Sequence, residues 1–369
     1  MIKKAIALKV LLISTITLSA QLDTAYSFFV AGHSYGQPGV NNKGLHPPFK
    51  GKFDYIKSNN KIEFGVLVGD IVSANPIEQD WIEVDLDLDT LGLPTYFAVG
   101  NHDMENRPVF ESRYGDTYKT FINQGDLFII LDPNLDGWNI SGNQLTFLKS
   151  TLNTHAAEVQ NIFVFFHQLL WQEKDNEFNY IRGNSDAGRG ENINFWTTVA
   201  PLFSNLKNET TFFAGDIGVS WASNVTYDKI GNLTFIATGM GDNDQDNFII
   251  ANVRADKTIE FEVVCLDELE INCLGELIDL AVVENLPLAT NSRLETTLLT
   301  YPNPANNRIN FSNNSSLINI QMFNTINEII FNQNTTENYI DVSNIADGIY
   351  ILKTNKNGIH NSSKINILR

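Results

Sequence analysis

The chain has 369 residues, a length that favours two domains over one. Apolar residues make up 43% of it and aromatic residues 11%, which is enough to build a sizeable core and excludes global disorder. The formal net charge is −18, so the overall field does not attract nucleic acid or anionic lipid, and no nucleic-acid partner is expected on that ground.

The N-terminal segment 1–20 has the pattern of a signal peptide. Three lysines give it a basic start, an apolar run follows, and the segment ends in the small pair Ser19-Ala20. The alternative is a membrane anchor, but Lys, Ser and Thr interrupt the apolar run, which is short for a span. Cleavage removes the three lysines and takes the charge from −18 to −21. No later apolar run is long enough to cross a bilayer, so we expect no membrane span after cleavage.

Residues 21–265 alternate between strand and helix patterns, which predicts an α/β domain with strands buried on both faces. Apolar runs bounded by Gly, Asp or Asn predict strands at 27–31, 64–68, 95–99, 127–131, 161–166 and 211–214. Helical spacing predicts helices at 48–57, 77–91, 143–152 and 194–206. Later runs predict further strands at 233–238, 248–253 and 258–264.

The acidic segment 266–298 lacks a clear period and is predicted to be a linker. The two cysteines of the chain, Cys265 and Cys273, lie at its start and either form a short-loop disulfide or remain unpaired thiols. In 299–369 Asn becomes frequent and helical patterns disappear. Short β-like runs there predict a small all-β sandwich domain with strands at 308–311, 318–323, 328–331, 339–342, 349–354 and 364–368.

Polar side chains follow the carboxyl ends of five predicted strands. They are His33, Asp70, the group Asn101-His102-Asp103, His167 and Asp216. Ligands of open α/β sheets bind at the carboxyl ends of the strands. A single Asp after a strand is usually a turn former, but five polar strand ends in one register predict a metal or acid–base site.

The order Gly69-Asp70, then Gly100-Asn101-His102-Asp103, then His167 resembles the calcineurin-like metallophosphoesterase family over about residues 25–265. The resemblance implies a four-layer αββα sandwich that hydrolyses phosphate esters at a two-metal site. Two metals clamp both oxygens of an in-line displacement and make hydroxide from bound water.

The resemblance also implies a role for each matching residue. Asp70 corresponds to the carboxylate that bridges both metals, and Asn101 and His167 correspond to ligands of the second metal. His102 corresponds to the group that protonates the leaving alkoxide or contacts the phosphate. Asp103 is expected to orient His102.

Two of the family motifs are incomplete. The first, Asp-x-His, is Ala31-Gly32-His33 here, so its carboxylate is missing. The last, Gly-His-x-His, is Gly215-Asp216-Ile217-Gly218, so both histidines are missing. The first metal position therefore keeps only His33 and Asp70.

The second metal position keeps more of its ligands. Asp70, Asn101 and His167 remain there, and Asp216 can stand in as a carboxylate ligand. We therefore expect one divalent ion at the second position. Three oxygens and one nitrogen suit Mn²⁺, Zn²⁺, Mg²⁺ or Ca²⁺ without choosing among them.

Two functions stay open on the sequence. The first is a secreted metal-dependent hydrolase of a phosphate mono- or diester, with His102 and Asp103 as catalytic groups and His33 assisting. The second is a catalytically inactive metallophosphoesterase fold that binds a ligand such as a glycan or a cell-wall component. Loss of the first metal position favours the second function, whereas one remaining metal can still activate water or polarise a phosphoryl oxygen, which favours the first.

Several other patterns admit two interpretations. The Gly-rich loop 33–39 either binds an anionic or sugar group or is a simple turn. Arg182 and Arg189 either grip a phosphate or decorate a surface loop, and Trp221 either walls the pocket or lies in the core. The loop 241–247 opens like an EF-hand but lacks the later Gly and Glu, which favours a solvated turn.

The C-terminal segment carries Tyr301-Pro302-Asn303-Pro304 and, further on, Gly348-Ile349-Tyr350. This pattern resembles the C-terminal sorting domain of the type IX secretion system of the Bacteroidetes. The resemblance implies export through the periplasm to a secreted or cell-surface location, with the secretion machinery as a partner. The alternative is a carbohydrate-binding or adhesion sandwich.

Overall fold

The computed structural model describes residues 24–40, 43–266, 273–283, 300–301, 305–311, 318–324, 329–337, 339–356 and 359–369. The chain divides into two compact units, 1–288 and 289–369. The predicted signal peptide 1–20 and residues 302–304 of the sorting motif lie outside the described residues. Within the described part of the chain, every helix is too short or too polar to cross a bilayer.

The first unit is built on two sheets. Its strands are β1 Thr24–Ala31, β2 Ile62–Val68, β3 Thr95–Ala98, β4 Lys119–Asn123, β5 Asp126–Ile130, β6 Asn161–Phe165, β7 Glu209–Ala214, β8 Val225–Ile230, β9 Leu233–Thr238, β10 Asn247–Arg254 and β11 Ile259–Cys265. The first sheet has the order β11-β10-β1-β2-β3, and the second has the order β4-β5-β6-β7-β9-β8. Strands β1, β2 and β3 run parallel to one another, as do β5, β6, β7 and β9.

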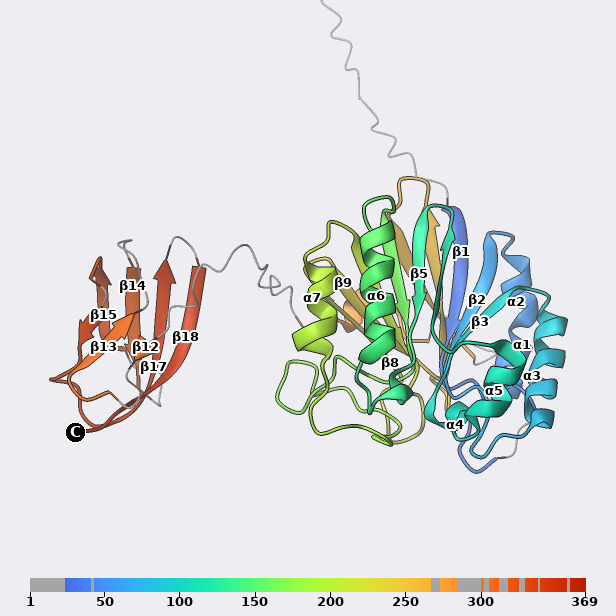
Figure 1. The fold of residues 1–369 in the computed structure, drawn as a ribbon, viewed down its shortest axis with the longest axis horizontal. Coiled ribbons are helices and arrows are strands. Elements are labelled where there is room, and N and C mark those ends of the chain that lie inside the picture. The colour runs from blue at the N-terminus through green and yellow to red at the C-terminus, as the bar shows by residue number, and fades with distance from the viewer. Residues whose placement is uncertain are drawn as a thin grey trace, which may run out of the picture. The chain divides into compact units, whose positions relative to one another are not determined.

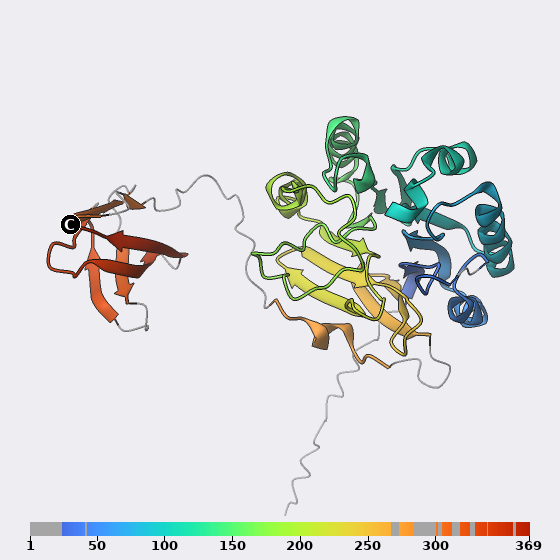
Figure 2. The same ribbon diagram turned by 90° about the horizontal axis from the view of Figure 1, so that it is seen from below.

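Helices cover the outer face of each sheet, so the layers run helix, sheet, sheet, helix (Figures 1 and 2). This arrangement confirms the predicted αββα sandwich. The first sheet is covered by α1 Pro47–Gly51, α2 Phe53–Ser58, α3 Glu78–Leu91 and α5 Arg107–Tyr114. The second is covered by α6 Gly142–His155, the π-helical turn η2 Phe195–Val199 and α7 Ala200–Ser204. The short elements α4 Asn101–Met104 and η1 Pro133–Leu135 lie in connections.

Phenylalanine side chains fill the space between the two sheets. Phe28 of β1 contacts Phe64 of its own sheet and Phe128 and Phe163 of the other, with ring centroids 5.4, 5.3 and 4.9 Å away. All four side chains are buried. Burying a Phe side chain stabilises a fold by about 2 kcal/mol, so this layer holds the sheets face to face.

Part of the segment that was expected to be a linker packs on the first unit. Cys265 and Cys273 form a disulfide. Beyond it, the 3-10 helix η3 (Leu277–Leu280) buries Leu277 between the sheets, and the N–H of Val283 donates to a carboxylate oxygen of Asp228 at 2.7 Å. A linker description therefore does not apply to residues 273–283.

The second unit is all-β, as predicted. Its strands are β12 Thr300–Tyr301, β13 Arg308–Phe311, β14 Ile318–Phe323, β15 Ile329–Thr335, β16 Tyr339–Asp341, β17 Gly348–Lys356 and β18 Ile359–Ile367. They form a sheet of order β12-β13-β16 and a sheet of order β15-β14-β17-β18. Side chains of both sheets share one apolar cluster that includes Ile309, Ile340, Ile320 and Leu352.

Candidate functional site

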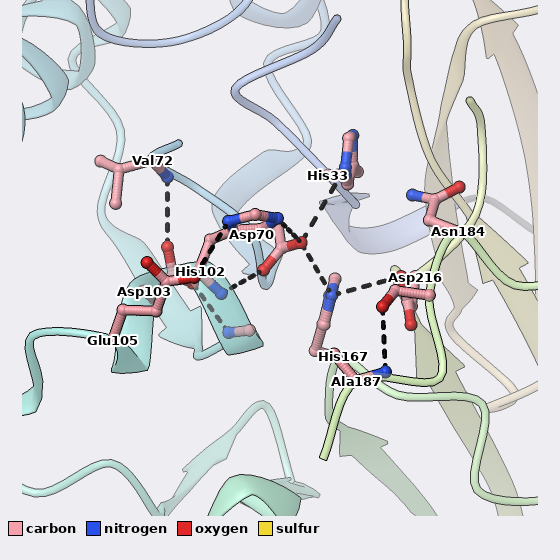
Figure 3. A network of polar contacts seen from close by, with 12 residues as sticks. His33, Asp70, Val72, His102, Asp103, Glu105, His167, Asn184, Ala187 and Asp216 are labelled. Carbon is pink, nitrogen blue, oxygen red and sulfur yellow. Dashed lines mark hydrogen bonds and ion pairs between the residues drawn. The ribbon is translucent and has the colours of Figure 1, made fainter. Parts of the chain in front are cut away.

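The polar strand ends of the two sheets meet at one place in the first unit (Figure 3). From the first sheet come His33 after β1, Asp70 after β2 and His102 in α4 after β3. From the second come His167 after β6 and Asp216 after β7. Parallel strands place their carboxyl ends at the same edge of a sheet, so this convergence follows from the topology.

Glycines let the two sheets touch backbone to backbone beside the site. A Cβ atom on Gly215 would lie 1.9 Å from the carbonyl oxygen of Val68, and one on Gly32 would lie 2.5 Å from the Cα of Gly215. No side chain fits at either position. This close approach brings the residues that follow β7 against those that follow β2.

Asp70 is the centre of the arrangement. Its Oδ1 accepts the backbone N–H of His102 at 3.0 Å. Its Oδ2 lies 3.3 Å from Nε2 of His167, 3.7 Å from Nε2 of His102 and 3.9 Å from Nε2 of His33. Burial alone would raise the pKa of Asp70, but the three histidines, with His167 first, lower it below its ordinary value. Asp70 also has φ of 49°, a conformation that non-glycine residues adopt rarely and often at functional sites.

His167 is fully buried and has a defined orientation. Its Nδ1 lies 2.9 Å from the carbonyl oxygen of Val68, a pure acceptor, so Nδ1 carries the proton in this contact. Its Nε2 then points at Asp70 and, 3.6 Å away, at Oδ1 of Asp216. This is the tautomer that presents a lone pair to a metal ion. Burial alone would lower the pKa of His167, but the charges of Asp70 and Asp216 raise it to about 10.

Asp216 has two buried oxygens that lack a hydrogen-bond donor among the described residues. Burial raises the pKa of its carboxyl group to about 7. The positive charge of His167 lowers this pKa, and the negative charge of Asp70 raises it further. A buried carboxylate without donors is costly unless a cation compensates it.

A divalent cation fits this triad. Ligand atoms of Asp70, His167 and Asp216 all lie within 4.8 Å of one another. Nε2 of His167 and both oxygens of Asp216 have no hydrogen-bond partner among the described residues, and a cation would satisfy all three atoms. Carboxylate oxygens with one imidazole nitrogen are a common donor set for divalent ions.

His33 is held as a neutral imidazole. Its Nδ1 lies 2.7 Å from the carbonyl oxygen of Met240, and its ring centroid lies 4.4 Å from that of Tyr35, with the two rings tilted by 46°. Burial lowers the pKa of His33 to about 4, which outweighs the opposing charge of Asp70. The unprotonated Nε2 therefore faces Asp70.

His102 and Asp103 occupy successive positions of α4 but do different things. The His102 ring is 27% exposed, with Nδ1 3.7 Å from a carboxylate oxygen of Glu105. The expected orienting contact from Asp103 is replaced: its oxygens accept the backbone N–H groups of Ile71, Val72 and Gly100 at 2.9, 3.1 and 2.7 Å. Asp103 thus fixes the backbone around Asp70 rather than the ring of His102.

The buried Asp103 carboxyl group has a raised pKa. Burial and the charge of Asp70 raise it to about 6, although the backbone N–H groups of Gly100 and Val72 and the charge of His167 act in the opposite direction. Asn101, the first residue of α4, is half-buried. Its side chain forms no hydrogen bond with another described residue, so its amide stays available to a ligand.

At both incomplete motifs, the space of a missing ligand is taken up by the apolar core or by the backbone. Ala31, which replaces the first-motif carboxylate, is buried in the apolar cluster under the helices of the first sheet. Gly218, which replaces the last-motif histidine, has φ of +106°, and a Cβ there would lie 2.5 Å from the backbone of Gly239 and Met240. The first metal position has therefore lost the room for a side chain at Gly218 as well as the ligand.

A cavity of about 680 Å³ opens above the triad. His33, Asp70 and His102 line its floor, while His167 and Asp216 lie buried beneath it. Its walls include residues that sequence patterns did not identify. They are Val40, Ser73, Ala74, Asn75, Ile77, Asp80, Asn184, Ser185 and Val219.

The residues that the sequence left with two interpretations fall into two groups, those that line the cavity and those that lie outside it. Tyr35, Gly39 and Trp221 line the cavity, so the loop 33–39 belongs to the site. Arg189 lies over the ring of Trp138 at 4.8 Å and donates to the carbonyl oxygen of Gln172 at 2.6 Å. Neither Arg182 nor Arg189 is among the cavity residues.

The acidic loop 241–247 is folded by its own contacts. Both oxygens of Asp246 accept backbone N–H groups, from Gly241 at 2.8 Å and from Asp242 at 2.7 Å. These bonds make the segment a self-capped turn and agree with the interpretation as a turn.

Two protein families match the chain. Residues 33–173 match the calcineurin-like phosphoesterase family, a stretch that contains Asp70, Asn101, His102 and His167 and ends before Asp216. Residues 299–368 match the secretion system C-terminal sorting domain. One stretch of the chain therefore matches a calcineurin-like phosphoesterase, and another matches a sorting domain of the type IX secretion system. The protein is a secreted or cell-surface, phosphoesterase-like protein, and both resemblances in its sequence are confirmed.

Solved structures are similar only at a distance. A purple acid phosphatase from yellow lupin (Lupinus luteus) seeds is 12% identical, with a TM-score of 0.49, over 67% of this chain and 52% of its own, so the chain spans about half the length of that phosphatase. The TT1561 protein of Thermus thermophilus is 11% identical, with a TM-score of 0.39, over 65% and 99%. PorZ, a surface component of the type IX secretion system of Porphyromonas gingivalis, is 10% identical, with a TM-score of 0.19, over 36% and 16%. No curated protein matches the chain.

Proposed function

We propose that the protein is a secreted, metal-dependent hydrolase of phosphate esters with a reduced site that holds one divalent ion. The observation that carries this proposal is the buried triad Asp70–His167–Asp216, in which Nε2 of His167 and both oxygens of Asp216 have no hydrogen-bond partner among the described residues. The sorting domain supports a route through the periplasm to the cell surface or the medium, with the secretion machinery as a partner.

The ion would take the second metal position of the family. Its ligands would be oxygens of Asp70, Asn101 and Asp216 and Nε2 of His167, a set that Mn²⁺, Zn²⁺, Mg²⁺ and Ca²⁺ all accept. A divalent ion bound there would polarise a phosphoryl oxygen and lower the pKa of a coordinated water.

The remaining residues would act on the substrate around that position. His102 lines the cavity and its ring is 27% exposed, so it can give a proton to the leaving alkoxide or hydrogen-bond a phosphate oxygen. His33 presents its neutral Nε2 to Oδ2 of Asp70, the oxygen that also faces His102. Asp103 would act as a positioning residue through the backbone that flanks Asp70.

Metal analysis tests the site directly. We expect the full chain, purified without chelator, to contain about one tightly bound divalent ion, and Asp216→Ala to lose it because the variant removes two of the three unpartnered ligand atoms. The measurement is elemental analysis per chain. Equal metal content in both proteins, or none in the wild type after soaking in Mn²⁺ or Zn²⁺, would contradict the one-ion site.

Replacement of His102 separates catalysis from metal binding. His102→Ala keeps the backbone N–H that Asp70 accepts, so we expect metal content to stay at the wild-type level. Turnover of a phosphodiester with an unactivated alkyl leaving group should fall by about 100-fold or more, as for loss of a general acid, because such an alkoxide needs a proton as it leaves. His155→Ala, at the far end of α6, serves as the control. Unchanged turnover in His102→Ala would remove His102 from the mechanism.

A second candidate function is a catalytically inactive protein that binds a glycan or cell-wall component in the same cavity. The loss of ligands at Ala31 and Gly218 favours it, because a two-metal mechanism is then no longer available. An inactive binding protein would show no metal-dependent turnover in the wild type, and its ligand affinity would be nearly the same in His102→Ala.

A further inference from the structure

The mouth of the cavity is apolar although its floor is polar. Three large hydrophobic side chains at the mouth are strongly exposed: Val40 at 42%, Ile77 at 59% and Trp221 at 58%. They come from three separate segments, the loop after β1, the start of α3 and the loop after β7. Scattered single exposed apolar residues are normal, but three around one cavity indicate a binding surface.

Trp221 is fixed in place rather than loosely exposed. Its indole N–H donates to the carbonyl oxygen of Asn184 at 3.0 Å. The Asn184 side chain in turn donates to the carbonyl oxygen of Ile217 at 3.0 Å and accepts the N–H of Val219 at 3.1 Å. The ring is therefore held on the cavity mouth before any ligand arrives, which lowers the entropic cost of packing a ligand against it.

The charges of the cavity select against dianions. The described residues that line it include no Lys or Arg, whereas the carboxylates of Asp70 and Asp80 are present. Phosphomonoester dianions are usually met by Arg or Lys at hydrogen-bond distance. One divalent ion held by Asp70 and Asp216 would leave little positive charge for a dianion, while a phosphodiester carries a single negative charge.

Together these features point to a substrate class. We infer that the site takes phosphodiesters whose non-leaving ester group is aromatic or similarly flat and apolar and packs against Trp221, Val40 and Ile77. This inference rests on the proposed function. In the hydrolysis a water oxygen bonds to phosphorus, the P–O bond to the leaving alcohol breaks, and one water proton reaches the alkoxide through His102. The products are an alcohol and a phosphomonoester.

The experiment compares substrates that share a leaving group. Bis(4-nitrophenyl) phosphate and methyl 4-nitrophenyl phosphate both release 4-nitrophenolate, and 4-nitrophenyl phosphate is the dianionic reference. With the wild-type full chain we expect the lowest KM for the bis-aryl diester and the highest for the monoester.

Trp221→Ala should raise KM for the bis-aryl diester about tenfold, as for loss of an aromatic contact, and leave KM for the methyl diester nearly unchanged. Trp221→Phe should retain the preference, and Ile278→Ala, an exposed residue on η3 outside the cavity, is the control.

A binding measurement keeps this inference separate from catalysis. Calorimetric titration with diphenyl phosphate and dimethyl phosphate reports affinity whether or not either is hydrolysed. If no ester is turned over but diphenyl phosphate binds more tightly, and Trp221→Ala removes the difference, the hydrolase proposal fails and the ligand class stands. If the monoester is preferred, or Trp221→Ala affects aryl and methyl compounds equally, the ligand class is wrong even though hydrolysis is observed.

Discussion

An Asp70→Asn variant is expected to lose its bound metal ion and to hydrolyse activated phosphodiesters at least about 100-fold more slowly than the wild type. The amide keeps the shape of the carboxylate and can still accept the N–H of His102. It removes the charge that faces His33, His102 and His167 within 3.9 Å. Elemental analysis and a turnover assay on the same sample measure the two effects together.

Asp89→Asn is the matched control for this variant. Asp89 is exposed on α3, so the substitution changes the net charge by the same amount without touching the site. It should behave like the wild type in both measurements. Normal metal content and turnover in Asp70→Asn would show that Asp70 is not a ligand.

A Gly215→Ala variant is expected to lose about 3 kcal/mol of its free energy of unfolding. The new methyl group would lie 1.9 Å from the carbonyl oxygen of Val68 and 3.0 Å from the Cα of Gly32. Both atoms belong to backbone, so no side-chain rotation can make room, and the second sheet must move away from the first. Equilibrium unfolding in urea, followed by circular dichroism, gives the free energy.

Gly51→Ala provides the comparison for the same chemical change. Gly51 is exposed at the end of α1, and nothing lies within 4 Å of its added methyl group. Its stability should equal or slightly exceed that of the wild type. Equal urea midpoints for Gly215→Ala and Gly51→Ala would mean that the sheets do not meet as tightly as described.

The sequence predicted the convergence of the strand ends because such ends are easy to locate. The strands before Asp70, His167 and Asp216 are largely apolar runs that end in Val, Phe or Ala, and parallel topology then forces the ends together. Elements without such contrast were missed. The edge strands β4 and β8 are partly exposed, and α4 has only four residues, too few to show a helical period.

The role of Asp103 shows a limit of reasoning from adjacency. Successive residues of a helix point about 100° apart, so a neighbour in sequence rarely supports the same side chain. In α4 this rotation turns Asp103 toward the backbone of Ile71 and Val72, away from the ring of His102. Trp221 shows another limit, since an aromatic residue near a strand end is equally consistent with core and surface until the loop around it is known.

The absence of the family histidine at Gly218 was visible in the sequence, but its consequence was not. Only the fold shows that the backbone of Gly239 and Met240 occupies the space a histidine would need. A Gly218→His change would therefore not rebuild the first metal position by itself.

The triad takes Asp70 from one sheet and His167 and Asp216 from the other, so an ion bound there would act as a clamp across the interface between them. Such an ion binds only when both sheets are packed together. By mass action, the free energy of unfolding then rises with the concentration of the free ion. At an ion concentration roughly 100 times the dissociation constant, the clamp would add about 2.7 kcal/mol to the folding free energy. The metal supply of its surroundings would then set the stability of the protein as well as its chemistry.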